Sequence, residues 1–338
     1  MKKILLVVCT LVMILGCTKK NDENNVDRKK VAIAVFIPGL RAGSPVYDML
    51  ATGVQRAGAD FSGTHPVDVT VTVIEAGVNQ AEWEPKLESL AAKNTYDLIV
   101  SSNPSIPAIV ASVSDLFPTQ KFLLLDGELA DYPTIYTLRY NQHEQSYLAG
   151  YAAALAAAER RSNRIGLIAA QEYPVMNNII LPGFIEGARA VSPDFSVDFR
   201  ILGNWFDAGK AADLAAGMIR DGAAVILPIA GGANEGAVQS AAEAGAKIIW
   251  FDTNGYAVRP GVIVGSAVIK QEKAAYEKTI LFLEGMLPFG TAEFVGVADG
   301  FVDFIVDDPD YRAAVPESIR EKQIELLNRI RNGELQLR

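Results

Sequence analysis

The chain has 338 residues, half of them hydrophobic, and a formal net charge of −9 at pH 7. Proteins that bind nucleic acid need basic patches to meet the phosphates, so this acidic balance argues against a nucleic-acid partner. The only cysteines are Cys9 and Cys17, which excludes disulfides, thiolate metal sites and a cysteine nucleophile from the remainder of the chain.

The N-terminus has the pattern of a lipoprotein signal peptide. A short positive start precedes an apolar run over residues 4–15, which is shorter than the roughly 20 residues that span a bilayer. A glycine stands directly before Cys17, as is typical of lipoproteins in which this thiol is acylated. We therefore expect residues 1–17 to be a signal peptide with Cys17 lipidated, and residues 18–30 to be a flexible tether. An ordinary signal peptide or an uncleaved anchor is the alternative.

Short apolar runs alternate with amphipathic stretches from residue 31 onward. Strands are expected at 31–36, 69–74, 98–101, 122–125, 165–169, 197–201, 224–228, 247–251, 262–265, 294–297 and 301–306. Helices are expected at 45–61, 80–93, 106–116, 146–160, 181–191, 211–220, 235–244, 271–285 and 316–331. Nearly continuous β-branched strands alternating with helices indicate parallel sheets that are covered on both faces.

The pattern restarts after the Ala-rich helix, and the chain is longer than one hydrophobic core usually serves. We predict an α/β fold with two doubly wound parallel-sheet lobes joined by a hinge. The N-terminal lobe would hold residues 31–142 plus about 267–292, and the C-terminal lobe residues 143–266 plus about 293–338. A single large doubly wound enzyme would show the same pattern. Ligand contacts are expected at the carboxyl ends of the strands, where the loops converge.

No catalytic motif stands out along the chain. It lacks a Gly-x-Ser-x-Gly elbow, a His-Glu-x-x-His pair, a Walker loop and a Gly-x-Gly-x-x-Gly turn after a strand. His65 lies in a polar turn and His143 begins a helix, where a polar partner or a helix-end role is expected. We predict no metal site. Paired carboxylates remain open as acid–base groups, so a flavin-using or hydrolytic enzyme is the second class.

Polar residues follow several of the predicted strands. Asp126 and Asp252 come directly after matching strands in the two halves. Carboxylates at such positions can accept hydrogen bonds from ligand hydroxyls or ring N–H groups, although a turn or helix cap is the alternative for Asp126. Asn103 and Glu172 also follow strands and are further candidates. A turn is the alternative for Asn103, and a solvated surface position for Glu172.

Aromatic and glycine residues extend this set of candidates. Trp205 lies in a loop between a strand and a helix, where it either packs in a core or stacks on a planar ring. Such stacking contributes about 0.5–1.5 kcal/mol beyond area burial. Tyr47 is the candidate for the opposing face, and Phe36 is a weaker one because it ends a strand. Gly232 lets the backbone approach a ligand closely. Lys270 begins a helix after a strand, although lysines are usually solvated.

Several segments occur in an order that resembles one known family. They are Tyr147-Leu148-Ala149-Gly150-Tyr151, Gly203-Asn204-Trp205-Phe206-Asp207, the glycine loop 230–236, Phe251-Asp252 and Lys270. In this order, from about residue 31 to residue 306, the sequence is similar to the Bmp, or PnrA-like, substrate-binding lipoproteins. The resemblance implies a type I periplasmic-binding fold and a nucleoside-like ligand held between the lobes.

The resemblance also implies roles for individual residues and partners. An aromatic side chain from the loop that contains Trp205 would stack on the base. Asp126, Asp252 and Lys270 would bind polar edges and ribose hydroxyls. Gly232 would approach the ligand through its backbone. The protein would be a monomer without a catalytic cofactor. It would be lipid-anchored on the periplasmic side of the cell membrane and would deliver its ligand to an ABC permease and ATPase in the inner membrane.

The first lobe departs from the family pattern. Nucleoside binders of the family carry Asp-Asp-Lys-Ser-Phe-Asn-Gln before the first helix, whereas residues 41–47 read Arg-Ala-Gly-Ser-Pro-Val-Tyr. Phe36 stands where the family often has Asp, and Trp205 replaces the usual Phe. These changes favour a wider ring system, such as an isoalloxazine between Tyr47 and Trp205. The sequence also resembles spirochaetal riboflavin-uptake lipoproteins of this family. Riboflavin is therefore the leading hypothesis for the transported ligand, and a purine nucleoside is the alternative.

Overall fold

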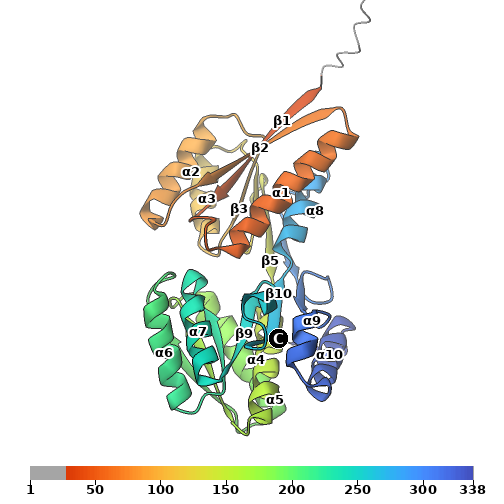
Figure 1. The fold of residues 1–338 in the computed structure, drawn as a ribbon. Coiled ribbons are helices and arrows are strands. Elements are labelled where there is room, and N and C mark those ends of the chain that lie inside the picture. Colours follow the sequence, from red (N-terminus) through yellow and green to blue (C-terminus); the bar gives the residue numbers. More distant parts are fainter. Residues whose placement is uncertain (1–27, 338) are drawn as a thin grey trace, which may run out of the picture.

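The computed structural model describes residues 28–337, which form two α/β lobes stacked end to end (Figure 1). The first sheet contains, from edge to edge, β11 (Ala292–Val295), β5 (Ile135–Tyr140), β4 (Phe122–Leu125), β3 (Leu98–Ser102), β1 (Lys29–Ile37) and β2 (Val67–Glu75). The second contains β12 (Val302–Phe304), β10 (Ile263–Ile269), β9 (Lys247–Asp252), β8 (Val225–Ile229), β6 (Arg164–Ala169) and β7 (Ser196–Ile201). The predicted signal peptide, Cys17 and most of the predicted tether lie outside the described residues.

Neighbouring strands run parallel throughout both sheets, except that β12 is antiparallel to β10. The first lobe carries α1 (Pro45–Thr64), α2 (Trp83–Ala92), α3 (Ile106–Leu116) and α8 (Gln271–Leu283). The second carries α4 (Gln142–Glu159), α5 (Leu181–Val191), α6 (Ala208–Arg220), α7 (Asn234–Ala244), α9 (Pro309–Ala314) and α10 (Glu317–Arg331). Short 3₁₀ turns occur at Gln80–Glu82, Gly231–Ala233 and Tyr256–Val258, and a π-helical turn at Met176–Ile180. The predicted α/β fold with two parallel-sheet lobes is confirmed.

Strand β1 explains why an unbroken apolar run forms a central strand. Its residues from Ile33 to Ile37 are fully buried, and they alternate between two core clusters. Val35 packs in one cluster and Phe36 in the other, because successive side chains of a strand point to opposite faces. A strand with helices on both faces therefore needs apolar residues at every position.

Close contact between α4 and α5 depends on glycines. An ideal Cβ at Gly150 would lie 2.0 Å from the carbonyl oxygen of Phe184, and one at Gly187 would lie 2.1 Å from the carbonyl oxygen of Tyr147. Real Cβ atoms do not approach oxygens so closely, so these two helices pack backbone against backbone. The same contact fixes α4, which begins at the junction of the lobes, firmly in the second lobe.

Three segments pass between the lobes: residues 140–142, 269–271 and 296–301. They are hydrogen-bonded to one another. The Asn141 N–H donates to the Val295 carbonyl at 2.7 Å, and the Lys270 N–H donates to the Phe301 carbonyl at 2.8 Å. Because the chain crosses back at residues 269–271, α8 lies in the first lobe beside α1, which is far from it in sequence (Figure 1).

The structure differs from the sequence-based expectation at several places, one of which is the short helix α9, which was not predicted. Residues 135–140 form a strand that was not predicted, and β11 pairs with this strand in the first sheet. The expected boundary near residue 293 assigned that segment to the second lobe, so the boundary lies a few residues later. A short strand does not reveal its partner, because pairing is decided by which sheet edge is open. None of the helices within residues 28–337 is long and apolar enough to cross a bilayer.

Candidate functional site

Asp126 and Asp252 occupy equivalent places in the two lobes. Strand β4 of the first sheet and β9 of the second have the same position in the strand order, and each leads into one of these aspartates. Both residues have left-handed backbones, with φ of 55° and 68°. Aspartate adopts this conformation more readily than most residues, so both strands can turn sharply where they end. The parallel placement inferred from the sequence is thus matched by the same local geometry.

The two carboxylates meet on one turn of α4. The Gln142 Nε2 donates to Asp126 Oδ1 at 2.9 Å, and the Gln145 Nε2 donates to Asp252 Oδ1 at 3.0 Å. Residues three apart on a helix lie on the same face, with Cβ atoms about 5–6 Å apart. The first turn of α4 therefore brings together a carboxylate from each lobe.

The surroundings of the pair favour its neutral forms. Burial, together with the negative charge of Asp252, raises the pKa of Asp126 to about 8. Burial raises the pKa of Asp252 to about 6, and the hydrogen bond from Gln145 opposes that rise. Both side chains nevertheless keep partial contact with solvent. No ion pair formed within residues 28–337 involves either carboxylate. At neutral pH the pair therefore holds about one proton.

Tyr47 and Asn103 form the first-lobe part of the site. The Tyr47 hydroxyl donates to the Pro38 carbonyl and accepts from Asn103 Nδ2, both at 3.0 Å. The ring lies against Gly39, where an added Cβ would be 2.9 Å from Tyr47 Cε2. Burial raises the pKa of Tyr47 to about 12, and the charge of Asp126 adds to this rise. Asn103, the hydrogen-bond partner of Tyr47, follows β3, which is the neighbour of β4 that leads into Asp126.

Trp205 and Tyr173 form the second-lobe part. Trp205 follows β7 and is 41% exposed, and its ring centroid lies 6.4 Å from that of Tyr173 at an interplanar angle of 41°. Burial raises the pKa of Tyr173, and the charges of Asp252 and Asp126 contribute. Tyr173 therefore lies against the exposed indole and feels the charge of both carboxylates. The glycine loop supports Trp205, because the Ala233 N–H donates to the Trp205 carbonyl at 3.3 Å. Gly232 is exposed beside it.

Three sequence-predicted residues have other surroundings. Phe36 is 0% exposed and packs in a core cluster, so it presents no surface to a ligand in this structure. Helices cover both faces of strand β1, so the last residues of this strand are buried as well. Glu172 is exposed and accepts a hydrogen bond from Asn177 Nδ2 at 3.3 Å. The Lys270 ammonium is 3.3 Å from a carboxylate oxygen of Asp303.

Sequence reasoning missed Gln142, Gln145, Tyr140 and Tyr173. Tyr140 is buried, donates to Gln271 Oε1 at 3.0 Å, and has a pKa raised by burial and by the charges of both aspartates. The amides lie in a helix and Tyr140 in a strand, where a pattern of apolar residues indicates packing only. Tyr173 had a usable signal, since it follows a predicted strand within four residues.

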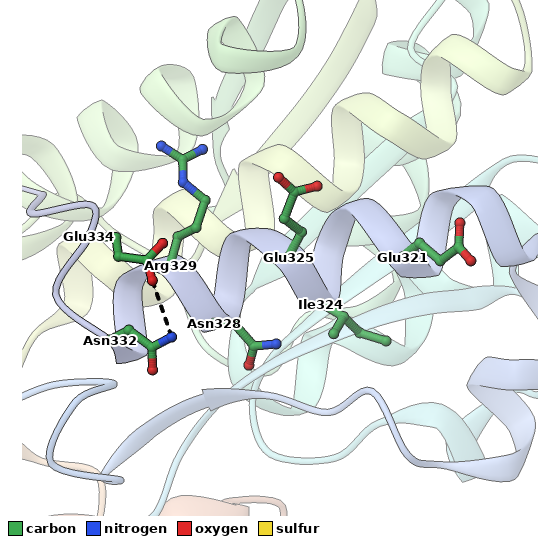
Figure 2. A pocket seen from close by; sticks show the side chains of 7 residues that line it. All are labelled: Glu321, Ile324, Glu325, Asn328, Arg329, Asn332 and Glu334. Carbon is green, nitrogen blue, oxygen red and sulfur yellow. Dashed lines mark hydrogen bonds between the residues drawn. The ribbon is translucent and has the colours of Figure 1, made fainter.

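A separate hollow lies along α10 (Figure 2). Its lining comprises Glu321, Ile324, Glu325, Asn328, Arg329, Asn332 and Glu334, and the Asn332 amide donates to Glu334 at 3.4 Å. None of the residues discussed above lines it. No group of three or more His, Cys, Asp or Glu in the described part of the chain is arranged to hold a metal ion.

A family model described as "ABC transporter substrate-binding protein PnrA-like" matches residues 30–336. The chain is 28% identical over 151 residues to the ABC transporter nucleoside-binding protein BmpA of Lactococcus lactis, covering 45% of this chain and 42% of that protein. It is 25% identical over 227 residues to an uncharacterised lipoprotein of Pyrococcus abyssi, covering 65% and 54%. These matches thus span about half the length of the relatives.

Solved structures support the fold. An ABC transporter solute-binding protein from Aeropyrum pernix superimposes with a TM-score of 0.75 at 21% identity, covering 91% of this chain and 93% of that one. At this identity the likeness concerns the fold alone. Together with the two equivalent parallel sheets, it confirms the type I periplasmic-binding fold.

Proposed function

Because the chain belongs to the Bmp, or PnrA-like, family of ABC transporter substrate-binding proteins, we propose that it captures riboflavin between its lobes for import. The family serves substrate binding for transport, so the protein is not an enzyme. Riboflavin combines a wide planar ring system with a chain of hydroxyls, and the site offers partners for both. No bond is made or broken in this function.

The observation that carries the proposal is the arrangement of Trp205, Tyr173 and the carboxylate pair. The Trp205 indole is 41% exposed to solvent, and the Tyr173 ring lies 6.4 Å away, so the two provide an aromatic surface for a flat ring. The carboxylates beyond Tyr173 offer acceptors for ring N–H or ribityl O–H groups. We place Tyr47 and Asn103 on the opposing wall, Gly232 beside the ring, and Lys270 at the polar end. Glu172 remains a predicted rim contact.

The proposed mechanism is ligand-stabilised closure. A ligand that contacts both lobes binds the closed arrangement more tightly than the open one, and it shifts the population by that difference. We propose that the three hydrogen-bonded connecting segments are the hinge about which the lobes move as units. We propose that the closed form then docks on an ABC permease with its ATPase. A lipid on Cys17 would hold the protein at the periplasmic side of the membrane, with residues 18–30 as a tether.

A purine nucleoside is the second candidate, because the Lactococcus lactis relative carries the name of a nucleoside-binding protein. A nucleoside offers the same two features, a planar base and vicinal hydroxyls, on a narrower ring system. The absorption spectrum of the freshly isolated protein distinguishes the two. A flavin carried through purification absorbs in the visible range, whereas a bound nucleoside does not.

The test of the proposed function is a titration of purified protein with riboflavin and, separately, inosine. We expect riboflavin fluorescence to be quenched on binding and the melting temperature to rise. Trp205→Ala should weaken riboflavin binding roughly tenfold or more, since 1.4 kcal/mol is a factor of ten. Leu116→Ala is the control, because Leu116 is an exposed apolar residue at the end of α3. Helix α3 connects two parallel strands, so this end lies at the amino ends of the strands, away from the site. If inosine binds more tightly than riboflavin, a purine nucleoside replaces riboflavin as the proposed ligand.

A further inference from the structure

The carboxylate pair brings two acids together without a neutralising cation. Asp126 comes from the first lobe and Asp252 from the second, and both are held on the first turn of α4. No arginine, lysine or histidine among residues 28–337 forms an ion pair with either. Two adjacent carboxylates in a poorly solvated place cannot both ionise readily, so such pairs share a proton.

Hydrogen bonds decide which oxygens of the pair remain available. Each aspartate uses Oδ1 to accept an amide N–H, from Gln142 in one case and Gln145 in the other. Those oxygens are therefore fixed as acceptors. The Oδ2 atoms are left to carry the shared proton or to meet a ligand.

An unpartnered acceptor beside the pair points to a ligand. The Gln145 side chain is fully buried, and its Nε2 donates to Asp252 and to the Ala267 carbonyl at 3.1 Å. Its Oε1 has no hydrogen-bond partner. Rotating the amide by 180° would only bring Oε1 against two acceptors. Buried polar atoms are nearly always satisfied, so this oxygen calls for a donor from outside the chain, which could reach it only when the lobes open.

We propose that Asp126 binds the ligand as an uncharged carboxylic acid that donates a hydrogen bond, while Asp252 and Gln145 Oε1 accept. This inference rests on the proposed function and adds the chemistry of its polar end. The ligand edge that fits is neutral and places an acceptor next to donors. An imide or lactam edge of a heterocycle has this pattern, and so does a pair of hydroxyl groups. An anionic group such as a phosphate does not fit here, because nothing on this turn compensates its charge.

The other groups facing the pair leave this assignment intact. Tyr47 on α1, Tyr140 on β5 and Tyr173 after β6 feel the charge of Asp126, and burial raises the pKa of all three, so they stay neutral. The pKa of Asp126 is the more strongly raised of the two acids, to about 8 against about 6 for Asp252. The hydrogen bond from Gln145 also stabilises the charged form of Asp252, so we place the shared proton on Asp126.

Isosteric amides test the assignment. We expect Asp126→Asn to bind riboflavin within about threefold of the parent at pH 7, since an amide also donates, whereas Asp252→Asn should lose at least tenfold, because it replaces the acceptor. Raising the pH from 7 to 9 should weaken parent binding about tenfold, as expected for loss of a proton of pKa near 8. Asp126→Asn should show no such loss, and its profile also reveals any ionisation of the probe itself. Asp115→Asn, at an exposed position on α3, is the control.

Two further arms complete the experiment. Lumiflavin, which lacks the ribityl chain, should show the same pH dependence if the ring edge meets the pair, and none if the hydroxyls do. Carbon NMR of labelled aspartate side chains in the free protein should show one carboxyl titrating near pH 8 that Asp126→Asn removes. If neither riboflavin nor inosine binds the parent, the proposed function fails while the NMR still decides this inference. The inference is overturned if Asp126→Asn binds as poorly as Asp252→Asn, or if both acids titrate below pH 5.

Discussion

Replacing Asp126 by asparagine should make folding stability less dependent on pH. The pKa of this carboxyl is about 8 in the folded protein, against 3.8 for an unperturbed aspartate. Between these pH values the folded state holds more protons than the unfolded state, so parent stability falls as pH rises. Stability from this group is fully present below about pH 4 and is lost as pH passes through 8. Asparagine does not titrate and abolishes this dependence.

The size of the effect follows from the shift. Each pKa unit corresponds to about 1.4 kcal/mol, so the full shift gives an upper bound of about 6 kcal/mol between pH 4 and pH 8. Water reaching the pair reduces this, and even a third of it, about 2 kcal/mol, is measurable by urea denaturation. Asp252 remains in the variant, and because its pKa is raised by burial, its titration near pH 6 is common to the parent and the variant.

The assay is urea unfolding of the parent, Asp126→Asn and the control Asp115→Asn at pH 5, 6, 7 and 8. The stability of Asp126→Asn minus that of the parent should grow steadily across this range, while the control should track the parent. A difference that is the same at every pH would refute the reasoning, whatever its sign. A constant offset alone would mean that asparagine changes packing without touching a titration.

Three other predictions concern the walls, the core and the anchor. Gly39→Ala should displace the Tyr47 ring, 2.9 Å from the added Cβ, and weaken riboflavin binding severalfold in the fluorescence titration. Gly43→Ala in the same loop, whose Cβ meets nothing, should not, even though both glycines have positive φ. Gly187→Ala should destabilise the fold by about 3 kcal/mol or more in urea unfolding, because its Cβ would strike the Tyr147 carbonyl. Gly63→Ala has open space around it and should be neutral or slightly stabilising. Equal effects of the two substitutions would contradict the close contact between the helices. Cys17→Ser should move the protein from the membrane to the soluble fraction on cell fractionation, and unchanged membrane association would exclude the thiol as the anchor.

Hydrophobic periodicity along the chain indicates most of the strands and helices. The runs that became β1, β3, β4, β6 and β9 are largely apolar along their length, because strands covered on both faces need apolar residues at each position. Strand β5 was missed because its residues mix polar and aromatic types. Strand β11 was placed in the wrong lobe, since four residues carry no information about which edge they join.

Side-chain roles were predicted where they depend on local position and missed where they depend on distant contacts. Asp126 and Asp252 could be selected because an acid directly after a buried strand lies at the edge where loops converge. Phe36 is a weaker candidate because it ends a strand, and its burial in a core cluster is what a strand covered on both faces predicts.

The sequence by itself determined most of the order of strands and helices, the α/β class and the acids at the strand ends, since each depends on neighbours along the chain. Only the tertiary structure decided that Asp126 and Asp252, 126 positions apart, share one turn of α4 through Gln142 and Gln145. The reason is physical: whether a carboxyl is charged depends on the groups and the water around it in space, and these come together only when both lobes have folded.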